Sequence, residues 1–72
     1  MTYVLYSKIG YRIKSKRIEK GMSQDEMALR LGVDRTYLAN VEIGKQNMSF
    51  IAYIRICKVL GISINELFGL KI

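Results

Sequence analysis

A chain of 72 residues can hold one small domain with a modest core, and half of its residues are hydrophobic, a high share for this length. Twelve Lys and Arg against six Asp and Glu give a formal net charge of +6, which favours an anionic partner such as nucleic acid or a membrane surface. The single cysteine excludes an internal disulfide, and the lack of histidine excludes zinc fingers and His-based catalysis.

Glycines divide the chain into helical segments. Proline is absent, and the glycines at positions 21, 32, 44, 61 and 69 fall between stretches with apolar residues at helical spacing. We therefore predict an all-α fold, one domain over residues 1–72 with five helices. Residues 1–6 lack the features of a signal peptide, and no apolar run reaches bilayer length, so we expect neither export nor a membrane span.

The first helix is predicted from about residue 7 to residue 20. Ile9, Ile13 and Arg17 recur at four-residue steps, so a charged side chain falls on the inward face and needs a partner there. Most of the other cations of this helix are interpreted as a solvated face that adds long-range attraction for an anion; they are Lys8, Arg12, Lys14, Lys16 and Lys20.

Residues 23–44 form two short amphipathic helices around a glycine turn, the spacing of a helix-turn-helix. Ser23 and Glu26 make a capping box that begins the first of these helices, and Gly32 ends it. Asp34 is a good N-cap for the next helix. In this second helix Leu38 and Val41 face inward. The residues that then face outward or lie at the flanks are Arg35, Thr36, Ala39, Asn40 and Ile43.

Glu42 falls on the inward side of the same helix, where a lone carboxylate would be unfavourable. We predict a salt bridge between Arg17 and Glu42 that ties the first helix to the third. The alternative is that both side chains reach solvent separately.

The fourth helix, about residues 49–60, is apolar on two faces, and Ser63 with Glu66 makes a second capping box before the last helix. Cys57 has core spacing and is interpreted as a small buried hydrophobe. Surplus apolar surface within about residues 50–72 predicts a homodimer contact, and the alternative is that these residues complete the monomer core. The candidates are Ile56, Ile64, Leu67, Phe68 and Leu70.

Several motifs together resemble the lambdoid phage repressor-like, Cro/cI-type family of helix-turn-helix regulators. They are residues 13–17 (IKSKR), 21–24 (GMSQ), 29–33 (LRLGV), 41–45 (VEIGK) and 60–67 (LGISINEL). Residues 34–37 (DRTY) and 47–49 (NMS) look most like the restriction-modification controller proteins of that family. The resemblance implies a five-helix domain whose third helix enters the DNA major groove.

The resemblance also assigns DNA contacts to individual residues. Gln24 and Ser23, at the start of the second helix, are expected at phosphates. On the third helix Arg35, Thr36 and Asn40 fall on base-reading positions, Ala39 suits a thymine methyl group, and Tyr37 either packs or reaches a phosphate. Lys45, Gln46 and Asn47 follow in a loop that the family uses for backbone contacts. Two positions depart from the pattern: Ile43 replaces a polar residue, and Gln46 stands where controller-type relatives often carry Arg.

The leading hypothesis is a sequence-specific, homodimeric transcriptional regulator in the cytoplasm, which occupies a near-palindromic operator and blocks or recruits RNA polymerase. It requires no cofactor and no metal. One alternative is a protein-interaction module such as a small antitoxin, with secondary DNA binding. A weaker alternative is a membrane-surface helix at residues 8–20. An enzyme is the least favoured class, since no catalytic constellation is present.

Overall fold

A computed structural model describes residues 2–70, and it contains helices as its only regular secondary structure over that range. The helices are α1 (Thr2–Glu19), α2 (Gln24–Leu31), α3 (Arg35–Glu42), α4 (Phe50–Leu60) and α5 (Ile64–Phe68). The predicted all-α fold with five helices is therefore confirmed. None of these helices is long and apolar enough to cross a membrane.

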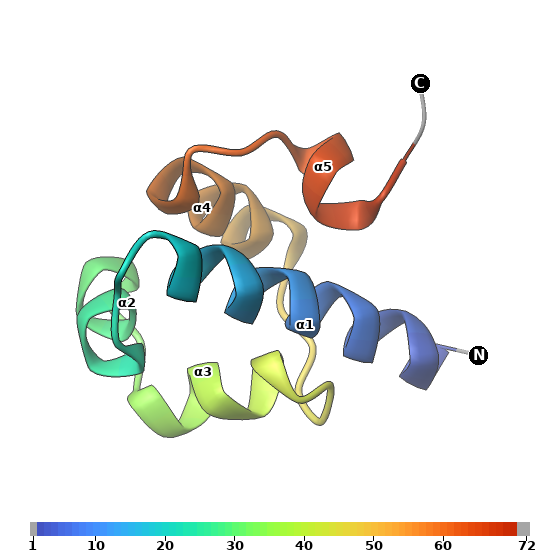
Figure 1. Ribbon diagram of the computed structural model, residues 1–72. Helices are drawn as coiled ribbons and strands as arrows, with labels where there is room; N and C mark the ends of the chain where they lie inside the picture. The colour runs from blue at the N-terminus through green and yellow to red at the C-terminus, as the bar shows by residue number, and fades with distance from the viewer. Residues whose placement is uncertain (1, 71–72) are drawn as a thin grey trace.

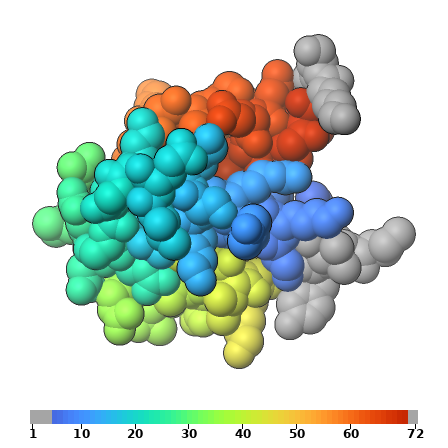
Figure 2. Space-filling model, in the orientation of Figure 1, coloured from blue at the N-terminus to red at the C-terminus, as the bar shows by residue number. Residues whose placement is uncertain are grey.

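The long helix α1 lies between α3 on one side and α4 with α5 on the other, as Figure 1 shows. The space-filling view shows that side chains fill the gaps between the ribbons on this face (Figure 2). Fully buried apolar side chains come from all five helices, and the largest are Ile13, Met27, Leu38, Ile56, Leu60 and Leu67. Cys57 is buried among them, as its spacing predicts.

Helix α1 begins at Thr2, earlier than the predicted start near residue 7. No glycine or proline separates residues 2–6 from the rest of the helix, so nothing in the local sequence stops it there. Arg12 is predicted from the sequence to lie on the solvated face of this helix. In the structure its Nη1 instead donates a hydrogen bond to the carbonyl of Leu67 at 3.3 Å. Arg12 thus ties α1 to the end of α5.

Serine caps fix the starts of three helices. The Ser23 Oγ accepts a hydrogen bond from the Glu26 backbone N–H at 3.0 Å, and Ser63 does the same for Glu66 at 3.0 Å. Ser49 caps α4 by accepting from the N–H of Ala52 at 3.2 Å. Asp34 occupies the N-cap position of α3, but its side chain makes no capping hydrogen bond, which corrects the role expected for it.

Gly10 explains how closely α1 and α3 can pack. It is buried within α1, and a Cβ at this position would lie 2.6 Å from the backbone oxygen of Glu42. Only a residue without a side chain lets the two helix backbones approach this far. The turn after α3 is equally close to α1, since a Cβ on Gly44, whose φ is +83°, would lie 2.7 Å from the Ser7 Cα.

Candidate nucleic-acid interface

A buried ion pair anchors the helix-turn-helix to α1. The Arg17 Nε lies 2.8 Å from the Glu42 Oε2, and the Arg17 Nη2 donates to the Glu42 Oε1 at 3.1 Å. The two residues are only 7% and 3% exposed. The Arg17 Nη1 also donates to the Met22 carbonyl at 2.8 Å, so this charged group has partners on several sides. This is the salt bridge that the sequence predicts, and the alternative of two separately solvated side chains is wrong.

Gln24 connects this ion pair to the protein surface. Its Nε2 donates to the Glu42 Oε1 at 3.0 Å, and its Oε1 accepts from the Arg35 Nη1 at 3.3 Å. A carboxylate can only accept, so Glu42 fixes which end of the Gln24 amide faces outward. Gln24 therefore presents an acceptor to the first residue of α3.

Arg35 is held by a second group as well. Its Nε lies 3.4 Å from the Asp25 Oδ1, and both side chains are more than half exposed. Sequence reasoning did not assign Asp25 any role. The signal that could have found it is an acidic residue in the first turn of α2 opposite a basic residue in the first turn of α3.

The outer face of α3 carries the predicted base-reading residues. Arg35 and Thr36 are exposed, and Ala39 and Asn40 are partly exposed. Ile43 is also exposed, as its position outside the core face predicts. Tyr37 is half-buried, packs against the core and donates from its hydroxyl to the Asn47 carbonyl at 3.4 Å; its contact with a phosphate stays a prediction. These positions form one surface with Gln24 at the start of α2.

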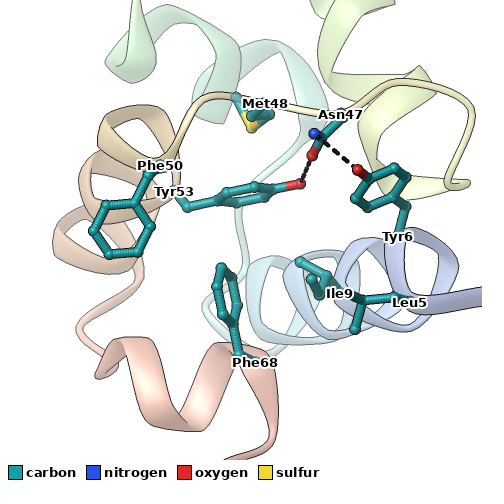
Figure 3. A pocket seen from close by; sticks show the side chains of 8 residues that line it. All are labelled: Leu5, Tyr6, Ile9, Asn47, Met48, Phe50, Tyr53 and Phe68. Carbon is teal, nitrogen blue, oxygen red and sulfur yellow. Dashed lines mark hydrogen bonds between the residues drawn. The ribbon is translucent and has the colours of Figure 1, made fainter. Parts of the chain in front are cut away.

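The loop after α3 contains three exposed polar residues, Lys45, Gln46 and Asn47. Asn47 uses its side-chain amide within the protein, since Nδ2 donates to the Tyr6 hydroxyl at 3.2 Å and Oδ1 accepts from the Tyr53 hydroxyl at 2.8 Å. Figure 3 shows Asn47 between the two tyrosines. The amide thus fixes the loop against α1 and α4, which leaves Lys45 and Gln46 as the better placed side chains for an outside partner.

A largely apolar pocket of about 230 Å³ lies beside this loop, between α1, α4 and α5 (Figure 3). It is lined by Leu5, Tyr6, Ile9, Asn47, Met48, Phe50, Tyr53 and Phe68. Tyr53 and Phe68 pack edge to face, with ring centroids 5.4 Å apart. Burial raises the pKa of the Tyr53 phenol, and burial likewise raises the pKa of the Cys57 thiol on the same helix.

The predicted dimer residues divide into two groups. Ile56 and Leu67 are 0% exposed in the protomer, so they belong to the core and offer no contact surface, which corrects that assignment. Ile64 and Phe68 are half-buried and Leu70 is exposed. Two apolar side chains of α4 that were not among the predicted dimer residues are more exposed than these: Phe50 is 60% exposed and Ile51 is 70% exposed.

Metal ligation has no visible basis in residues 2–70, where no group of three or more Cys, Asp or Glu side chains is placed to hold an ion. Two of the acids of this range pair with basic side chains of other elements: Glu42 pairs with Arg17, and Glu66 lies 3.3 Å from the Lys16 Nζ.

Comparison with known proteins places most of the chain in one family. Residues 13–67 match the family described as helix-turn-helix. The control protein C.MunI from Mycoplasma sp is 39% identical over 63 residues, which cover 86% of this chain and 85% of that protein.

Solved structures agree with this match. The restriction-modification controller protein C.AhdI from Aeromonas hydrophila has a TM-score of 0.84 at 35% identity, over 90% of this chain and 98% of that one. The controller protein C.Esp1396I, solved as a tetramer in complex with its natural 35 base-pair operator, has a TM-score of 0.78 at 35% identity, over 92% of this chain and 87% of that one.

Proposed function

The chain belongs to the Cro/cI-type helix-turn-helix family, and we propose that it is a sequence-specific DNA-binding transcriptional regulator. The observation that carries the proposal is the bracing of α3: Glu42, the last residue of α3, is locked to α1 by the buried ion pair, and Arg35, the first, is held by Gln24 and Asp25. A rigid helix with donors on its outer face is what base readout requires. The net charge of +6 supports a polyanionic partner.

The proposed contacts divide by chemistry. Arg35, Thr36 and Asn40 read base edges, with the Arg35 guanidinium suited to guanine and the Asn40 amide to adenine. Ala39 contacts a thymine methyl group. Ser23, Lys45 and Gln46 face the phosphates, and Gln24 contacts a phosphate through its backbone N–H at the start of α2, because its side-chain amide is held by Glu42 and Arg35. Asn47 and Tyr37 support the loop after α3 from within the protein.

We further propose that the protein acts as a homodimer through an apolar surface that we call the α4/α5 surface: Phe50, Ile51, Ile64, Phe68 and Leu70. Phe50 and Phe68 border the same pocket, so the exposed start of α4 and the end of α5 lie near one another. Burial of these apolar side chains between two protomers favours dimerisation. A twofold dimer places its recognition helices about 34 Å apart, which matches successive major-groove faces of an operator with two half-sites.

Within the family, the restriction-modification controller proteins are the class that we favour, because C.MunI and C.AhdI align with nearly the whole chain. A cytoplasmic location, where DNA is accessible, is part of this proposal. So is a contact with RNA polymerase if the protein activates transcription.

Selection of bound sequences from a random DNA pool tests the proposal directly. We expect a near-palindromic site with half-site centres about 10 base pairs apart, and affinity for the winning sequence that falls steeply with salt. Failure to enrich any sequence with the purified chain would contradict the proposal, and DNA binding that appears only with a second protein would favour an antitoxin-like module.

The oligomeric state is tested by light scattering with Ile51→Glu. This variant is expected to be monomeric, because a charge replaces an exposed apolar side chain of the α4/α5 surface. Leu29→Glu is the matched control: Leu29 is 82% exposed on α2, outside the α4/α5 surface, and its substitution is expected to leave the dimer intact. Equal effects of the two substitutions would refute this choice of surface.

A further inference from the structure

Two neighbouring carboxylates in the first turn of α2 have different partners. The Glu26 Oε2 lies 3.0 Å from the Arg30 Nη2, one turn along the same helix. The Asp25 Oδ1 instead lies 3.4 Å from the Nε of Arg35, across the turn on α3. Asp25 therefore places a negative charge beside a side chain proposed to read DNA. This charge repels the phosphates of any DNA that approaches it.

The contacts on Arg35 occupy only part of its guanidinium. Nε faces Asp25, and Nη1 donates one hydrogen bond to the Gln24 Oε1 at 3.3 Å. A guanidinium carries five N–H donors, so Nη2 and the second N–H of Nη1 have no partner among the residues that the structure describes. Two adjacent nitrogens with donors are the group that guanine O6 and N7 accept together.

The arrangement has two consequences for DNA binding. A long side chain that is already held loses less conformational freedom when it meets its base, which favours the correct site. The Asp25 carboxylate also competes with any phosphate for the Arg35 cation, which disfavours binding to DNA that offers no guanine at this position. Both effects widen the gap between specific and non-specific affinity.

We propose that Asp25 is a specificity-determining residue, which positions Arg35 for a base and keeps it from pairing with a phosphate. This inference rests on the proposed function, because it needs an operator that Arg35 reads. It predicts a role in DNA readout for an acidic side chain that need not touch the DNA itself.

The test compares Asp25→Asn with Glu26→Gln, which removes the same charge from the next residue. Dissociation constants are measured at one salt concentration for the selected operator and for the same operator with the guanine opposite Arg35 replaced. Since exposed ion pairs are weak, we expect Asp25→Asn to reduce the discrimination between the two DNAs by about twofold to fivefold. Glu26→Gln is expected to tighten binding to both DNAs equally and to leave their ratio unchanged.

The same two substitutions in an Arg35→Ala background show whether Asp25 acts through Arg35. We expect Asp25→Asn to leave discrimination unchanged there, because the group that it positions is gone. An effect of Asp25→Asn that survives in this background, or one that Glu26→Gln reproduces, would overturn the inference while leaving the proposed function intact. A wild-type protein that discriminates between no two sequences would overturn both.

Discussion

Substitution of Glu42 by Gln is expected to remove a large part of the stability of this domain. The change keeps the shape of the side chain but leaves the Arg17 cation, 7% exposed, with the Met22 carbonyl and a neutral amide as partners. Removal of one member of a buried ion pair typically costs about 3–5 kcal/mol. A folded chain of 72 residues has a total stability of about 4–11 kcal/mol at 0.05–0.15 kcal/mol per residue.

Urea unfolding followed by circular dichroism measures this loss, and Glu26→Gln is the matched control. Glu26 forms an ion pair of similar length, 3.0 Å with Arg30, but both side chains are about half exposed. Its loss is expected to cost less than about 1 kcal/mol. The double variant Arg17→Met, Glu42→Leu should recover much of the loss, because no buried charge remains. Equal destabilisation by Glu42→Gln and Glu26→Gln would refute the reasoning that burial makes this ion pair important.

Three further predictions address the site, the helix packing and the pH dependence. Arg35→Ala is expected to cost about 1–3 kcal/mol on the selected operator and to relax base choice, whereas Lys45→Ala should weaken all sequences alike; unchanged discrimination by the Arg35 variant in a binding titration would argue against its role. Gly10→Ala is expected to destabilise the fold by about 1–3 kcal/mol in thermal unfolding, because the new methyl group overpacks the contact between α1 and α3; a stability gain, as usual for Gly→Ala in a helix, would show that the two helices can separate freely. Burial raises the pKa of the Cys57 thiol above its ordinary 9.0, so the unfolded chain loses this proton first and stability falls as the pH rises from about 9 through the folded-state pKa. Cys57→Ala should make that alkaline decline shallower in unfolding measured between pH 7 and 10.5, and an unchanged decline would mean that the thiol titrates alike in both states.

Local signals allowed most of the fold to be predicted from the sequence. The serine caps at positions 23 and 63 and the left-handed glycines at 32, 61 and 69 act within one or two turns of chain, so their residue types are enough to place helix ends. The ion pair of Arg17 with Glu42 could also be predicted, because two charged residues at core-facing positions of different helices must neutralise one another.

The burial of individual apolar residues could not be predicted in the same way. Ile56 and Leu67 are fully buried in the protomer, although the sequence alone assigned them to a dimer contact. Ile56 on α4 and Leu67 on α5 are buried because α1, α4 and α5 pack against one another, and the periodicity of one helix carries no information about its neighbours. The exposure of Phe50 and Ile51 likewise depends on which faces of α4 its neighbours leave uncovered.

The sequence by itself determined the helices, their order, the helix-turn-helix and the residue types on its outer face, because these follow from periodicity, caps and turns within short segments. Only the tertiary structure decided that Gly10 lets α1 approach α3, that Arg12 ties α1 to α5, and that Asp25 and Gln24 hold Arg35. Each of these contacts joins side chains or backbones on different helices, and its geometry depends on how those helices pack rather than on any pattern within one of them.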